Sequence, residues 1–86
     1  MIIKGTLLFQ KANLGSKSEG IYPFIVTEDG ERFRVTLVGD NPFENSILKT
    51  YESKKVILDG DFNENGKLIA TKIEDDQDDN ESAETN

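Results

Sequence analysis

Two dipeptides, Asp29-Gly30 and Asn65-Gly66, each separate two runs of alternating apolar and polar residues. Asp-Gly and Asn-Gly readily adopt the positive φ angles of tight hairpin turns, because glycine has no Cβ and Asn and Asp tolerate the left-handed region. Each dipeptide therefore predicts a β-hairpin. Two hairpins account for much of an 86-residue chain, so we expect one small domain built mainly of strands.

The register of the first hairpin follows from a two-residue turn at Asp29-Gly30. One face of the ribbon then carries only apolar pairs, which are Val26–Phe33, Phe24–Val35 and Tyr22–Leu37. The other face is mixed and carries Thr27–Arg32, Ile25–Arg34, Pro23–Thr36 and Ile21–Val38. We expect the apolar face to form the core and the mixed face to lie outside.

A two-residue turn at Asn65-Gly66 predicts the second hairpin in the same way. The apolar pairs are then Phe62–Ile69 and Leu58–Ile73, with Val56 on the same face. The same register brings residues of opposite charge together, in the pairs Asp59–Lys72 and Glu64–Lys67. This agreement between charge and apolar pairing supports the register.

The segment between the hairpins predicts a short helix, with Asn41 as N-cap, Pro42 at the first position and Glu44 at the third. Its buried stripe consists of the apolar residues at helical spacing, Phe43, Ile47, Leu48 and Tyr51. Residues 2–10 predict a strand, in which Gly5 permits a sharp bend or a close crossing of strands. Residues 11–20 predict a long polar loop.

This order of strand, loop, hairpin, helix and hairpin resembles the OB-fold, a small barrel that binds oligonucleotides or oligosaccharides. The segment "VILDGDFNENGKLIATKIE" is similar to the closing strands of many such barrels. The resemblance implies an all-β fold with one short helix, a five-stranded OB-like barrel over residues 1–73. It also implies that a ligand would lie on the second and third strands.

The net charge of −7 belongs to the end of the chain. Ten basic residues balance ten acidic ones over residues 1–73, whereas residues 74–86 hold seven acidic residues and no basic one. A segment with so little apolar surface cannot offset its ordering entropy, so we expect a disordered acidic tail. The N-terminus lacks a signal peptide, and no segment approaches the roughly 20 apolar residues of a membrane span. We therefore expect a soluble, cytoplasmic protein without membrane contact.

The chain contains no cysteine and no histidine. Disulfides, thiolate nucleophiles, the usual zinc sites and histidine acid-base catalysis are therefore excluded. Asp59 and Asp61 lie two residues apart, but opposite Lys72 they are better interpreted as a charge-paired surface than as catalytic carboxylates. We expect a non-enzymatic protein that needs no cofactor.

Residues 61–66 match the first half of a calcium-binding loop, D-x-[DN]-x-[DN]-G, through Asp61, Asn63, Asn65 and Gly66. The twelfth position of such a loop is a bidentate glutamate, and here it is Lys72. The flanking segments also alternate as strands, where the motif requires helices. A hairpin turn is therefore the favoured interpretation, and no metal is expected.

Cations gather where the resemblance places a ligand. The candidate nucleic-acid contacts are Arg32, Arg34 and Thr36 on the first hairpin, Lys11 and Lys17 in the long loop, and Lys67 at the last turn. The predicted register assigns Tyr22, Phe24 and Phe33 to the core, so no aromatic platform for base stacking is expected. Weak, salt-dependent binding of single-stranded DNA or RNA is the leading hypothesis.

Two alternatives remain open. The arginines, balanced by Glu28 and Glu31, would be ordinary surface, or the protein would bind another protein through an exposed apolar patch of Ile21, Ile25 and Val38. The acidic tail would compete with phosphate for the basic face, or would only keep the protein in solution. The sequence does not indicate an oligomeric state.

Overall fold

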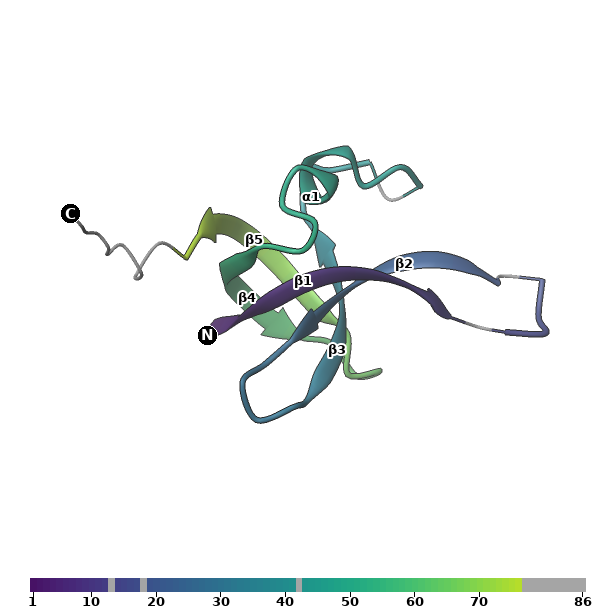
Figure 1. Ribbon diagram of the computed structural model, residues 1–86, viewed down its shortest axis with the longest axis horizontal. Coiled ribbons are helices and arrows are strands. Elements are labelled where there is room, and N and C mark those ends of the chain that lie inside the picture. The colour runs from purple at the N-terminus through teal and green to yellow at the C-terminus, as the bar shows by residue number, and fades with distance from the viewer. Residues whose placement is uncertain (13, 18, 42, 77–86) are drawn as a thin grey trace.

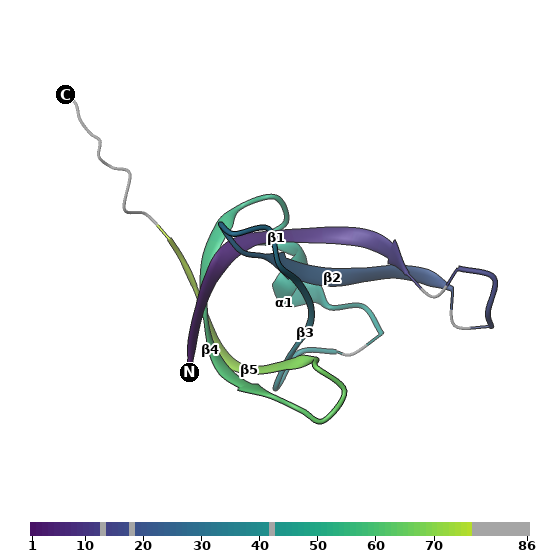
Figure 2. The same cartoon turned by 90° about the horizontal axis from the view of Figure 1, so that it is seen from below.

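The computed structural model describes residues 1–12, 14–17, 19–41 and 43–76. Its elements are β1 (Ile2–Ala12), β2 (Gly20–Val26), β3 (Arg32–Leu37), α1 (Ser46–Lys49), β4 (Lys55–Phe62) and β5 (Leu68–Asp75). The strands form one closed barrel in the order β1-β2-β3-β5-β4, and the helix lies between β3 and β4 in the chain (Figures 1 and 2). The predicted class, all-β with one short helix and five strands, is confirmed.

The barrel closes because β1 pairs with two different strands. Residues 2–6 of β1 lie antiparallel to β4, and residues 6–12 lie antiparallel to β2. Gly5 stands where β1 passes from one partner to the other, and a Cβ atom there would overlap the carbonyl oxygen of Val26. The close crossing predicted at Gly5 is therefore confirmed. The remaining seam is the parallel pairing of β3 with β5.

The core fills the inside of this barrel with aliphatic side chains from every element. Its buried members are Leu7, Ile25, Val35, Leu37, Leu48, Val56, Leu58, Leu68 and Ala70. Phe33 and Phe62 pack against this cluster and meet edge to face, with ring centroids 4.8 Å apart. Burial of these apolar surfaces is the main source of stability in so small a domain.

The register predicted for the first hairpin is wrong by one residue. Thr27 donates its N–H to the carbonyl of Glu31, so the loop has three residues and ends at Gly30, with φ of 87°. Glu31 also donates its N–H to the Thr27 hydroxyl oxygen, at 3.2 Å. This geometry, a turn followed by a left-handed glycine, fits the twist of the strands as well as a two-residue turn does.

A shift of one residue moves every side chain to the opposite face. Ile25 now lies opposite Phe33 and is fully buried, whereas it was expected outside. Phe24 lies opposite Arg34 instead of Val35, and Tyr22 lies on the same outer side. The β2–β3 ladder ends at Phe24, next to Pro23, which has no N–H to continue it.

The second hairpin has the same three-residue loop, and a β-bulge farther along the strands restores the predicted register. Asn63 donates its N–H to the carbonyl of Lys67, so Phe62 lies opposite Leu68, not Ile69, and the predicted Glu64–Lys67 pair does not form. A β-bulge beside Asp59 inserts Thr71 into β5. Beyond the bulge, the predicted pairs Asp59–Lys72 and Leu58–Ile73 are confirmed.

The predicted helix is shorter and begins later. Asp40 accepts hydrogen bonds from the N–H groups of Ile47 and Leu48, all at 3.1 Å, and so caps α1 from outside. Asn41 instead caps the preceding turn, where it accepts hydrogen bonds from residues 43 and 44. Pro42 lies outside the described residues.

Only part of the predicted helical stripe is buried. Leu48 is fully buried and Tyr51 packs against the core, as expected. Phe43 is 92% exposed and Ile47 is 44% exposed, so burial of these two residues was wrongly predicted. Phe43 precedes the helical turn, where helical spacing does not apply, and Ile47 lies in a single turn that buries only Leu48.

Two boundaries also differ from those predicted. The predicted loop over residues 11–20 is shorter, because the β1–β2 ribbon extends to the pair Ala12–Gly20 and projects from the barrel (Figures 1 and 2). β5 ends at Asp75, two residues beyond the predicted domain boundary at Ile73. Residues 77–86 of the acidic tail lie outside the described residues. No helix in the described part of the chain is long and apolar enough to cross a membrane.

The contact at Gly5 makes a testable prediction. Gly5→Ala should lower the free energy of unfolding by about 2–3 kcal/mol, because the new methyl group meets backbone that cannot move aside. Gly20→Ala is the matched control, since its nearest contact would be 3.7 Å from the Tyr22 ring. Urea unfolding should show a change within about 0.5 kcal/mol for the control. Equal stability of the two variants would contradict the close crossing.

Candidate nucleic-acid interface

One groove brings cationic and aromatic side chains together. It lies between the start of β3 and the β4–β5 turn and has a volume of about 480 Å³. Its lining residues are Phe24, Arg32, Phe33, Arg34, Asn65, Gly66 and Lys67, and we call it the arginine groove. Parallel pairing of Val35 with Leu68 places the residues just before them, Arg34 and Lys67, side by side in the sheet.

Both arginines of the groove lie on aromatic rings. The guanidinium carbon of Arg32 is 4.4 Å from the ring centroid of Phe24, and that of Arg34 is 4.0 Å from the ring centroid of Tyr22. At these distances the positive charge interacts with the negative face of the ring. The shifted register of β2 and β3 produces both contacts, because it turns Phe24 and Tyr22 to the side that carries the arginines.

A hydrogen bond to a third strand, β1, holds the side chain of Arg32 in place. Arg32 Nη1 donates to Gln10 Oε1 at 2.8 Å, and Gln10 lies opposite Tyr22 in the β1–β2 pair. Arg32 therefore has a ring beneath it and an acceptor beside it. These two contacts restrict a side chain that would otherwise sample many rotamers.

The structure brings together three of the six predicted contact residues. Arg32, Arg34 and Lys67 line the arginine groove. Thr36 lies farther along β3, opposite Ile69, and is half-buried. Lys11 follows Gln10 directly, so strand alternation turns it to the opposite face of the ribbon. Lys17 lies in the loop at the far end of the projecting ribbon (Figure 2).

The sequence interpretation missed the neutral residues of this site. These are Gln10, Tyr22, Phe24, Phe33, Asn65 and Gly66. A signal for the correct register was present, because Thr27-Glu-Asp-Gly and Asn63-Glu-Asn-Gly share a spacing in which the first side chain can accept a hydrogen bond from the residue after glycine. That spacing favours a three-residue loop, and with it an aromatic outer face.

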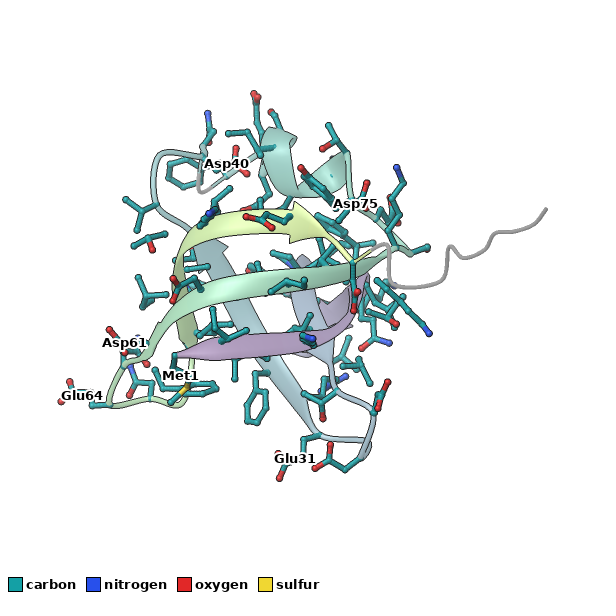
Figure 3. All side chains as sticks on the ribbon, turned by 90° about the vertical axis from the view of Figure 1, so that its left-hand side faces the viewer. Met1, Glu31, Asp40, Asp61, Glu64 and Asp75 are labelled. Atoms are coloured by element: carbon teal, nitrogen blue, oxygen red, sulfur yellow. The ribbon has the colours of Figure 1, made fainter. Side chains whose placement is uncertain are left out.

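Acidic residues border the groove without entering its lining. Glu31 and Glu64 are exposed, and Figure 3 shows them on the β2–β3 and β4–β5 loops, directed away from the barrel.

A larger hollow of about 530 Å³ lies elsewhere, against the first half of β1. It mixes Lys4 and Lys55 with Glu28, Asp29 and Asp76, so its charges largely cancel. The arginine groove is thus the better candidate for an anionic ligand.

The calcium-like segment is a hairpin loop in the structure. Asn63 Oδ1 accepts hydrogen bonds from the N–H groups of Asn65, at 2.9 Å, and Lys67, at 3.0 Å. The oxygen that a metal would need is thus used by the turn. Among the described residues, no group of three or more Asp, Glu, His or Cys is arranged to hold a metal ion.

The charge-paired face around Asp59 is arranged differently from the prediction. Lys72 forms its ion pair with Glu74, at 2.9 Å, and Asp59 lies 3.4 Å from the N-terminal ammonium group. The hydrogen bond from Lys72 to Glu74 raises the pKa of Lys72, and the charges of Glu74 and Asp59 add to the shift. All these groups are largely solvated, so the face is ordinary charged surface.

The two ring contacts can be tested separately by NMR. Tyr22→Leu should move the side-chain proton resonances of Arg34 downfield and leave those of Arg32 in place, because the ring-current shift disappears only where the ring is lost. Phe24→Leu should move the side-chain proton resonances of Arg32 downfield and leave those of Arg34 in place. Each variant is the control for the other. Arginine resonances that respond to neither change would show that the stacked arrangement is not populated.

Comparisons of the chain with protein-family models, with curated proteins and with solved structures found no match. Function is therefore inferred from the charges and the geometry of the arginine groove.

Proposed function

We propose that this protein is a non-enzymatic binding module that holds single-stranded DNA or RNA in the arginine groove. The observation that carries the proposal is the convergence of Arg32, Arg34 and Lys67, from two parts of the chain, on one groove with aromatic rings. The resemblance to the OB-fold points to the same place, since such barrels bind ligands over strands 2 and 3 and the loop between strands 4 and 5.

Three cations in one groove suit a chain of phosphates. Arginine binds phosphate through a planar fork of donors, and lysine adds a mobile point charge. With three phosphate contacts, binding to a single strand should weaken with salt with a logarithmic slope of about −2. The expected affinity is modest, and low ionic strength is the condition in which to detect it.

The apolar alternative loses its central member in the structure. Ile25 is fully buried in the core, so the patch predicted from Ile21, Ile25 and Val38 does not exist as a continuous surface. Ile21 and Val38 are exposed, at 60% and 59%, but Ile25 does not join them on the surface. The groove is the stronger basis for a function.

Removing both guanidinium groups tests the proposal. The Arg32→Ala, Arg34→Ala double variant should bind a labelled oligothymidine at least about tenfold more weakly in fluorescence anisotropy, and its salt slope should become shallower. The control is Lys49→Ala with Lys54→Ala, which removes two exposed cations that do not line the groove. If both double variants lose affinity equally, binding follows general charge and the groove is not the site.

The acidic tail gives a second test. The chain leaves the barrel beyond Asp75, whereas the groove lies at Lys67, at the other end of β5; Figure 3 shows Asp75 far from Glu64 of the β4–β5 turn. An eight-residue strand spans about 26 Å, and ten extended residues reach at most about 36 Å. The tail would therefore reach the groove only in extended conformations.

A chain ending at Asp76 keeps all of β5 and loses four acidic residues. We expect it to bind the oligonucleotide only about two- to threefold more tightly than the full chain at low salt. The four carboxylates that are removed repel the phosphates, but they act from a distance at which the repulsion is weak. At moderate salt the two chains should bind equally. A tenfold or larger gain would show that the tail occupies the groove directly.

A further inference from the structure

The two guanidinium groups form the outer layer of the arginine groove. Phe24 is only 4% exposed, because the Arg32 guanidinium lies over its ring, whereas Arg32 itself is exposed. Arg34 lies over the ring of Tyr22, and both of these residues are half-buried. A ligand that enters the groove therefore meets guanidinium planes before it meets aromatic rings.

We propose that unpaired bases stack on the planes of Arg32 and Arg34, and that Gln10 is the positioning residue that keeps the Arg32 plane in place. This inference rests on the proposed function, and it names how that site recognises its ligand. Planar guanidinium groups accept stacked bases as aromatic side chains do. The ring beneath each guanidinium holds the group over its face before the ligand arrives, which lowers the entropy lost on binding.

The hydrogen bond that Arg32 donates to Gln10 adds a constraint that the ring cannot provide. A ring holds a cation above its face but leaves it free to turn about the ring normal. The bond from Arg32 Nη1 to Gln10 Oε1, at 2.8 Å, removes that freedom and uses only one of the five N–H donors of arginine. Within the described residues, only this hydrogen bond of the Arg32 guanidinium is seen, so its other donors can bind phosphate while its face binds a base.

This arrangement selects a class of ligand. Bases that stack on guanidinium planes must be unpaired and accessible, so single strands qualify and continuous duplexes do not. Phosphate chains without bases would gain only the charge interaction. Because every base has a flat face, stacking of this kind is tolerant of sequence.

The test compares two probes with the full chain at low ionic strength. One is a short labelled oligothymidine, and the other is a strand of the same length with an abasic site in place of every base. We expect the oligothymidine to bind at least about tenfold more tightly. Equal binding of the two probes would overturn the stacking inference and leave the proposed function intact. Failure of both probes to bind would overturn the proposed function, and this inference with it.

Two variants separate charge from stacking. In Arg32→Lys with Arg34→Lys the charge is retained and the planes are lost, so affinity for oligothymidine should fall about tenfold, while affinity for the abasic strand, which loses only the forked phosphate contacts, should fall much less. Gln10→Met should weaken oligothymidine binding a few-fold and leave the abasic strand and the urea midpoint unchanged. The pair Lys49→Ala and Lys54→Ala is the control. Wild-type discrimination between the probes in the lysine variant would overturn the role of the guanidinium planes, and in Gln10→Met it would overturn the positioning role.

Discussion

The three-residue hairpin loop is the constraint on which this structure depends. Thr27 and Asn63 each open such a loop, and in each a side-chain oxygen accepts a hydrogen bond from the residue after a left-handed glycine. The loop length determines which residues face each other across the ribbon. Since neighbouring side chains alternate between faces, the loop also decides which residues enter the core and which form the surface.

The same register serves both stability and the candidate site. It buries Ile25 against the core and leaves two aromatic rings outside, where they would be exposed apolar surface on a small barrel. Arg32 and Arg34 cover these rings, so the charged groups that suit a phosphate chain also shield apolar area from water. The site is thereby part of the fold's own packing, and the guanidinium groups are arranged before any ligand binds.

The charges of the chain are separated along β5. The barrel through Ile73 is neutral in sum, but three of its ten cations converge on the groove near the start of β5, while the excess of acidic residues follows Ile73. The low isoelectric point thus describes the end of the chain, and it does not describe the groove. Closure at Gly5 and at the parallel β3–β5 seam brings Lys67 beside Arg34, although more than thirty residues separate them in the sequence.

The sequence by itself determined the type and order of the elements and the residue pairs beyond the bulge in the second hairpin, and it showed that Gly5 permits a close crossing. Local signals suffice for these features, because hydrophobic alternation and turn residues each depend on only a few neighbouring positions. The face on which Tyr22 and Phe24 lie follows from the three-residue loop, which the Thr27-Glu-Asp-Gly spacing favours, although alternation alone fits a two-residue turn equally well. Only the tertiary structure decided that Phe43 is exposed, and that Gln10, Arg32 and Lys67 come together from three strands or their turns. Those contacts depend on strand pairing between distant parts of the chain, and no local pattern contains that information.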